Sequence, residues 1–234
     1  MAFYFIFFFT ITIAVSIIIF YLPYVLRVLE QYRLKNYCKK LGILVLTYDD
    51  GPGHRLTDQL LNIFIDENVN VTFFFVGKRA GKHPEIVYRA MNDGHEIGFH
   101  GYDHINYWKV SCDKALSDIG MGYQSLSFAM KNKPIFRPPF GKLTLLSWMK
   151  LKNMKIKIGY WTYASRDTYN HHKSIDNIIK DINDDNGGVI LLHDYDRTND
   201  YIYNEIFVID LTIKLIQLAK QNQWRILKLG DLIH

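Results

Sequence analysis

Cysteine is scarce in this sequence of 234 residues, which contains only Cys38 and Cys112. Two thiols cannot form the disulfide framework of a small secreted domain, and they cannot supply a cysteine-rich zinc site. Repeats and low-complexity segments are also missing, and the length suits one sizeable domain. The two cysteines therefore do not indicate whether the protein lies in an oxidising or a reducing compartment.

A basic surface stripe is missing as well. The formal net charge is +5, but the lysines and arginines are scattered, and no stretch interleaves basic with aromatic residues. Nucleic-acid binding depends on a basic patch that follows the phosphate backbone. We therefore expect no nucleic-acid partner.

Charged side chains are absent from the first 26 residues, and most of residues 3–22 are Phe, Ile, Val or Tyr. A helix needs about 20 such residues to cross roughly 30 Å of hydrocarbon. A cleaved signal peptide would need a positive start, a shorter apolar stretch and a small-residue cleavage site, and none of these is convincing. We therefore expect a single-pass transmembrane anchor at 1–28, a basic juxtamembrane segment at 29–40 and a globular domain at 41–234, with a buried core helix as the less favoured alternative.

Positive charge lies on one side of this apolar segment. No charged residue precedes it, and five basic residues follow it: Arg27, Arg33, Lys35, Lys39 and Lys40. By the positive-inside rule this bias favours a cytoplasmic domain. Other signals can orient a single span, so the side of the membrane stays open.

The rest of the chain alternates short apolar runs with longer amphipathic ones, which is the pattern of repeated βα units around a parallel sheet. We expect seven strands, at 43–47, 71–76, 95–99, 135–137, 156–162, 189–192 and 224–228. We expect helices at 57–67, 84–91, 113–130, 143–152, 175–182 and 206–221, with Thr57, Ser111 and Ser174 near their starts. Periodicity does not separate an open doubly wound sheet from a closed barrel. No G-x-G-x-x-G segment follows the first strand, which disfavours dinucleotide binding.

Chemically capable side chains follow the expected strands. They are Asp49 and Asp50 after the first strand, His100 after the third, Arg137 after the fourth, Asp167 after the fifth and His193 after the sixth. The carboxyl ends of parallel strands converge on one face, where active sites are built. We therefore expect these groups to share one site.

Two adjacent carboxylates enter a Gly-Pro turn at Asp49 and Asp50. Neighbouring residues of a regular strand point to opposite sides, so one carboxylate can bind a metal while the other acts as a base. On its own, Asp-Asp-Gly-Pro is equally typical of a simple turn. His100 and His104 can converge on the same ion through a helical turn, which leaves an open position for water or substrate.

Two further segments offer a cation and a proton donor. Arg137 lies in a proline-rich segment where it could hold Asp49 ionised, with a surface arginine as the less favoured alternative. His193 ends an apolar run and could donate a proton to a leaving amine, although a core histidine is common there. Leu191, two residues earlier, would share its face and could shape a small apolar pocket.

The segments T-Y-D-D-G-P, H-x-x-x-H, R-P-P-F and L-L-H-D occur in this order between Leu44 and Asp194. Together they resemble the motifs of the polysaccharide deacetylases, carbohydrate esterase family 4. The resemblance implies an α/β fold, a distorted (β/α) barrel of about seven parallel strands. It also implies one divalent ion, usually zinc, and hydrolysis of N-acetyl groups on peptidoglycan, chitin-like or related glycans.

The same resemblance implies roles residue by residue. Asp49 resembles the general base, Arg137 the arginine that pairs with it, and His193 the general acid. Asp50, His100 and His104 resemble the metal ligands. Substrate contacts are expected from Leu191 at the acetyl methyl group, from the backbone N–H of Tyr48 or of a neighbouring residue at the oxyanion, and from Phe140 and Asp167.

Two positions depart from the family pattern. Gly101 replaces the usual Ser or Thr after the first histidine, so a hydroxyl that stabilises the loop is missing. The motif Asp-x-x-Asp-Trp appears as 164–169, with Ala164 in place of the first Asp and with no Trp. We interpret Asp167 as the substitute carboxylate that tunes His193. Two alternatives stay open: a deacetylase or deformylase of a lipid-linked sugar at the membrane surface, and an inactive glycan-binding relative.

Overall fold

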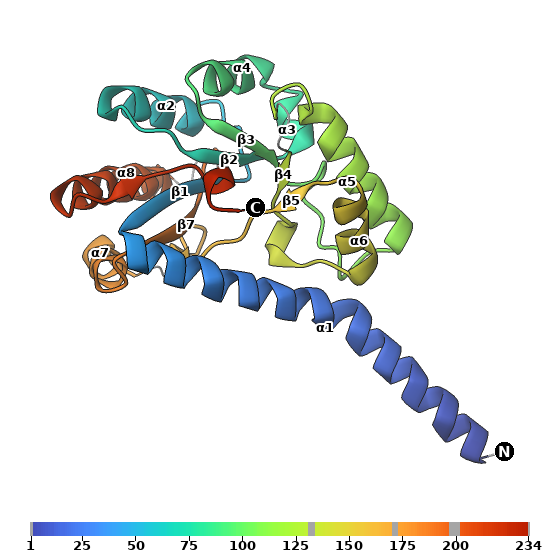
Figure 1. The fold of residues 1–234 in the computed structure, drawn as a ribbon. Helices are drawn as coiled ribbons and strands as arrows, with labels where there is room; N and C mark the ends of the chain where they lie inside the picture. Colours follow the sequence, from blue (N-terminus) through green and yellow to red (C-terminus); the bar gives the residue numbers. More distant parts are fainter. Residues whose placement is uncertain (1, 131–133, 170–172, 197–201, 234) are drawn as a thin grey trace.

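The computed structural model describes residues 2–130, 134–169, 173–196 and 202–233. Its strands are all parallel and form one sheet, in the order β5-β4-β3-β2-β1-β7-β6, with β8 paired to the start of β1. Seven strands curl into a half-barrel, and helices cover its outer side (Figure 1). The expected α/β barrel is confirmed.

The strands are short, and most match the apolar runs of the sequence. They are β1 (Ile43–Asp49), β2 (Thr72–Phe75), β3 (Glu96–Phe99), β4 (Ile135–Phe136), β5 (Lys157–Ile158), β6 (Tyr163–Ala164), β7 (Gly187–His193) and β8 (Arg225–Ile226). The α-helices are α1 (Ala2–Leu41), α2 (Leu56–Glu67), α3 (Gly77–Ala80), α4 (Pro84–Asn92), α5 (Cys112–Leu126), α6 (Leu145–Asn153), α7 (Ile175–Asp184) and α8 (Ile202–Gln221).

Alternate residues of the strands face two different cores. On β1, Leu44 and Leu46 face the helices that surround the sheet, whereas Ile43 and Val45 face the barrel interior. This follows from the two-residue period of a strand, which turns successive side chains to opposite sides. Asp49 therefore shares the inward face of β1 with Val45, which directs its carboxylate into the barrel.

The expected single strand at 156–162 is wrong. Only Lys157–Ile158 of this run forms a strand, β5, and the next strand, β6 at Tyr163–Ala164, lies at the opposite edge of the sheet. Residues 159–162 cross from one edge to the other, so the curled sheet brings its two edges close together without pairing them. Local sequence could not reveal this break, because it depends on the distant partners of the two strands, β4 for β5 and β7 for β6.

Helix α1 lies across this open side of the half-barrel (Figure 1). Its side chains Leu34 and Cys38 are fully buried in the interior core together with Val45, Phe74 and Val189. At its end, the Lys39 carbonyl accepts a hydrogen bond of 2.7 Å from the Asn186 side chain. The region expected to be a separate juxtamembrane segment is thus part of one continuous helix that completes the interior core.

The N-terminal part of α1 extends away from the domain (Figure 1). Among the described residues, one helix is long and apolar enough to cross a membrane, over Phe9–Leu41, with a mean hydropathy of 2.2 in its most apolar window. Only 6% of that window is buried. Such a helix is compatible with a membrane span or with a signal sequence.

The capping expectations had mixed outcomes. The hydroxyls of Ser111 and Ser174 accept hydrogen bonds from backbone N–H groups at the starts of α5 and α7, as expected. Thr57 is not a cap, because α2 begins before it and its hydroxyl instead donates to Asp194. The start of α2 is capped from a distance by the Asp196 carboxylate, which accepts from two backbone N–H groups.

Leu34→Ala tests whether α1 is part of the folded domain. Loss of this buried side chain leaves a cavity in the interior core, so the free energy of unfolding should fall by about 2–5 kcal/mol. Chemical denaturation of the full chain in detergent, followed by tryptophan fluorescence, measures this change. Leu29→Ala is the control, because Leu29 is 60% exposed; equal stability of the two variants would contradict the packing described here.

Candidate active site

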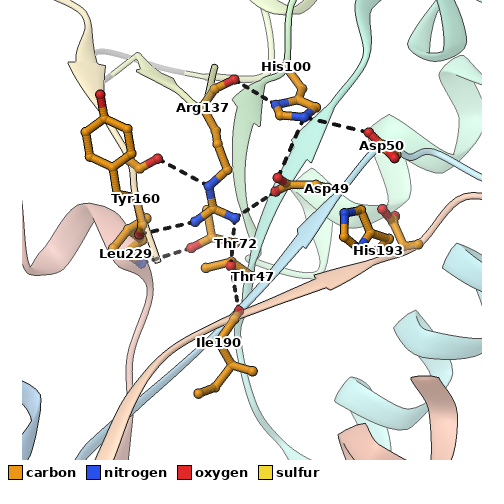
Figure 2. A network of polar contacts seen from close by, with 12 residues as sticks. Thr47, Asp49, Asp50, Thr72, His100, Arg137, Tyr160, Ile190, His193 and Leu229 are labelled. Atoms are coloured by element: carbon orange, nitrogen blue, oxygen red, sulfur yellow. Dashed lines mark hydrogen bonds and ion pairs between the residues drawn. The ribbon is translucent and has the colours of Figure 1, made fainter. Parts of the chain in front are cut away.

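The carboxyl ends of the strands meet at one cavity of about 660 Å³. Its wall includes Asp49, Asp50, His100, His104 and His193, which come from β1, β7 and the segment after β3. Figure 2 shows His193 beside the two aspartates at the end of β1. The sequence placed these groups together by the positions of the strand ends, and the structure brings them into one pocket.

Arg137 lies behind this wall and is fully buried. Its Nη1 donates hydrogen bonds to Asp49 Oδ1 at 2.7 Å and to Thr47 Oγ1 at 2.8 Å. Its other nitrogens donate to the carbonyls of Gly159 and Tyr160, at 3.2 and 3.4 Å (Figure 2). The guanidinium therefore holds Asp49 in one orientation, and the simple surface arginine is excluded.

Asp50, His100 and His104 form the one group of potential metal ligands found among the described residues. One ligand atom from each lies within 4.8 Å of the other two. Asp50 Oδ1 is 3.0 Å from His104 Nε2 and 3.7 Å from His100 Nε2. It is also a buried oxygen with no hydrogen-bond partner. Such an atom fits a cation, because an unsatisfied buried carboxylate oxygen is otherwise costly.

The backbone prepares His100 to act as a ligand. Its Nδ1 is 2.7 Å from the carbonyl of Arg137, which fixes this nitrogen as the N–H donor and leaves Nε2 free to bind a metal. Burial lowers the pKa of His100 to about 4, so the ring is neutral near pH 7. A neutral imidazole with a free Nε2 is the form that binds zinc.

Asp167 holds His193 from behind. Asp167 Oδ1 is 2.8 Å from His193 Nδ1, and Oδ2 accepts a hydrogen bond of 2.9 Å from the His193 backbone N–H. Burial opposes ionisation of the ring, but the adjacent Asp167 carboxylate outweighs it and raises the pKa of His193 to about 9. A carboxylate thus contacts His193 even though Ala164 replaces the first Asp of the motif.

Leu191 and Phe140 both line the cavity, as the sequence analysis required. Tyr48 does not. The backbone of Tyr48 lies within the sheet, opposite Phe73 on β2 and Leu192 on β7. Its ring packs in the outer core, and its hydroxyl forms a hydrogen bond of 2.8 Å with the Thr212 hydroxyl. The expected substrate contact from Tyr48 is therefore not supported, because its strand is paired on both sides.

The structure accounts for Gly101. This residue has a φ of +74°, and a Cβ atom there would lie 2.4 Å from Asp118 Oδ2. The Asp118 carboxylate accepts hydrogen bonds from the Asp103 backbone N–H at 2.8 Å and from the Tyr107 hydroxyl at 2.7 Å. A carboxylate from α5 therefore stabilises the loop from outside, which replaces the missing hydroxyl.

Sequence reasoning missed two residues that hold the turn of the two aspartates. Asp194 Oδ1 accepts from the Gly51 N–H at 3.0 Å, and Oδ2 accepts from the Thr57 hydroxyl at 2.8 Å. A Cβ on Gly51 would lie 2.2 Å from this carboxylate, so only glycine fits. Arg79 donates to the Asp50 carbonyl. The sequence could have indicated Asp194, because this residue directly follows His193. No sequence feature pointed to Arg79.

The profile of the polysaccharide deacetylase family matches residues 36–159, more than half of the chain. The chain belongs to this family. Its curated relatives include a peptidoglycan-N-acetylglucosamine deacetylase of Bacillus cereus, 28% identical over 154 residues that cover 65% of this chain and 72% of that protein. A peptidoglycan-N-acetylmuramic acid deacetylase of Bacillus subtilis is 29% identical over 77% of this chain, but the match spans only 38% of that longer protein.

Solved structures agree with the family assignment. A crystal structure of a peptidoglycan N-acetylglucosamine deacetylase bound to a hydroxamate-type benzamide is 27% identical to this chain, with a TM-score of 0.70. The match covers 82% of this chain and 87% of that one. These relatives are named as carbohydrate deacetylases, which are hydrolases of N-acetyl amides.

The three candidate ligands predict zinc binding. We expect the metal-free full chain to bind one zinc ion, and we expect His104→Gln to weaken binding by more than the roughly 10–100-fold that loss of an outer partner costs. Isothermal titration calorimetry measures the affinity, and elemental analysis measures the stoichiometry. His54→Gln, at an exposed position outside the group, should bind zinc normally. Unchanged affinity in His104→Gln would exclude this site.

Proposed function

We propose that this chain is a metal-dependent N-deacetylase that removes the acetyl group from an N-acetylated amino sugar in a glycan. One observation carries the proposal: Asp49 and His193 line the same pocket as Asp50, His100 and His104. A bound divalent ion, with zinc as the expected one, would polarise the acetyl carbonyl and lower the pKa of a nearby water. Asp50, His100 and His104 would hold it.

Asp49 is proposed as the general base. Its Oδ1 accepts a hydrogen bond of 2.7 Å from Arg137 Nη1, so the carboxylate cannot rotate freely. Its Oδ2 lies 3.7 Å from His100 Nε2, at the edge of the proposed metal position. A carboxylate held there can take a proton from water as the water attacks the acetyl carbon.

His193 is proposed as the general acid. Asp167 holds its Nδ1 side, so Nε2 remains to face the pocket. The raised pKa keeps the ring protonated near neutral pH, which lets it donate a proton to the departing sugar amine. Leu191, beside it on the inward face of β7, would contact the acetyl methyl group, and Phe140 would pack against a sugar ring.

Asp49→Asn tests the base. Loss of the base should lower kcat by about 10²–10⁴-fold, measured as acetate released from an N-acetylglucosamine tetramer by the zinc-loaded full chain. Zinc binding should persist, because Asp49 is not among the proposed ligands. Circular dichroism checks folding, since Arg137 loses a charged partner. Asp66→Asn, an exposed aspartate, is the control, and full acetate release by Asp49→Asn would reject the proposed base.

Asp167→Asn tests the acid through the pH profile. Without the negative charge, His193 loses its proton at lower pH, so the alkaline limb of kcat/KM should move toward lower pH. A bound cation lowers the pKa of His193 in both proteins, so the decisive quantity is the difference between them. Asp176→Asn, whose side chain is 86% exposed, should leave the limb in place. An unmoved limb in Asp167→Asn would count against His193 as the acid.

A further inference from the structure

Helix α1 directly contacts the wall of the candidate active site. Arg27 Nη1 donates a hydrogen bond of 2.8 Å to the carbonyl of Gly141, and Gln31 Nε2 donates one of 2.7 Å to the carbonyl of Trp161. Gly141 and Trp161 both line the pocket. The apolar helix and the pocket wall therefore form one unit, with no linker between them.

Further toward the N-terminus, α1 meets the domain at Trp108. The rings of Phe20 and Tyr21 lie 5.7 and 6.1 Å from the Trp108 ring, and Lys142 Nζ lies 5.0 Å from the same ring. Before this point α1 extends away from the domain (Figure 1). Aromatic and lysine side chains of this kind are typical of a membrane–water interface.

The contact of α1 with Trp108 marks where a membrane–water interface would lie along the helix. The 19 residues from Ala2 to Phe20 span about 28 Å at 1.5 Å per residue, close to the roughly 30 Å of hydrocarbon that a span must cross. Arg27 lies seven residues past Phe20, about 10 Å along the helix axis. The pocket wall that Arg27 contacts is consequently held close to the headgroups.

The surface beside the pocket wall that Arg27 contacts has the composition of a membrane-contacting surface. No acidic residue occurs between Asp118 and Asp167. Within this stretch, loop 139–143 and α6, which packs beside α1, form a surface that we call the α6 face. It exposes apolar side chains and carries lysines: Phe140, Leu146, Met149, Lys142, Lys150 and Lys152. The nearby acid on α1, Glu30, is paired with Arg33 at 2.6 Å.

We propose that the α6 face rests on the lipid headgroups, so that the pocket takes its substrate from the membrane as an N-acetylated saccharide linked to a lipid. This inference rests on the proposed function and adds the substrate class. Phe140 belongs both to the α6 face and to the pocket wall, and it is 56% exposed. Tyr169, on the rim of the same pocket, is 64% exposed. Lysines attract anionic headgroups, and exposed apolar side chains insert beneath them.

The placement is tested without any activity measurement. Met149→Cys and Ile65→Cys are each made in a Cys112→Ser background, labelled with an environment-sensitive NBD fluorophore, and reconstituted as full chains in phosphatidylcholine–phosphatidylglycerol vesicles. Ile65 is exposed on α2, away from the α6 face. We expect blue-shifted emission and quenching by brominated lipids at position 149 only. Equal, water-like emission at both positions overturns the membrane placement and leaves the proposed function standing.

The substrate class is tested with two substrates in the same vesicles: an N-acetylglucosamine disaccharide on a polyprenyl pyrophosphate, and a free N-acetylglucosamine tetramer. We expect kcat/KM for the lipid-linked substrate to be higher. The double variant Leu146→Asp/Met149→Asp, outside the pocket wall, should lower it at least about tenfold, because carboxylates are repelled by anionic headgroups. Hydrolysis of the tetramer should be unchanged.

The matched control is Ile65→Asp/Ile206→Asp, which adds the same charges at exposed apolar positions on α2 and α8. It should leave both activities unchanged. The membrane substrate is wrong, and deacetylation stands, if kcat/KM for the tetramer equals that for the lipid-linked substrate. The same conclusion follows if the two double variants have equal kcat/KM for the lipid-linked substrate. If neither substrate releases acetate, the proposed function fails, and this inference fails with it.

Discussion

The buried guanidinium of Arg137 is the interaction on which the rest of the site depends. It contacts Thr47 and Asp49 on β1, and it contacts the carbonyls of Gly159 and Tyr160 in the segment that crosses between the edges of the sheet. A buried charge is tolerated only when such partners satisfy it, and a planar, forked cation can reach several at once. The same residue therefore orients the proposed base and ties together the open side of the half-barrel.

The effect of Arg137 extends to the candidate metal ligands through its backbone. Its carbonyl fixes the Nδ1–H form of His100, while its side chain holds Asp49. The two adjacent aspartates are thereby separated in role. Asp49 ends a regular strand with its carboxylate inside the barrel, whereas Asp50 has a φ of +75° and leaves the strand toward His104. This left-handed backbone, held by Asp194 and Gly51, lets neighbouring carboxylates serve different atoms.

The sequence predicted those features that depend on local pattern. Apolar runs located most strands, and the polar residues that follow them identified Asp49, His100 and His193 as neighbours, because parallel strands end on one face. Features that depend on distant pairing were missed. The run at 156–162 is largely apolar and was expected to be one strand, but β5 ends at Ile158 and the chain crosses to the opposite edge of the sheet before β6 begins at Tyr163. The roles of Asp118 and Asp194 likewise arise from loops brought together by the fold.

Helix α1 carries the largest difference between the sequence pattern and the structure. Composition divides it near residue 28, where charged residues begin, but packing does not follow that division. Leu34 and Cys38 complete the interior core, while Arg27 and Gln31 hold the pocket wall. A flexible linker would let the domain sample many distances from its anchor. A continuous helix fixes that distance by its rise per residue, so in this protein the position of the pocket relative to the apolar segment is determined by the fold itself.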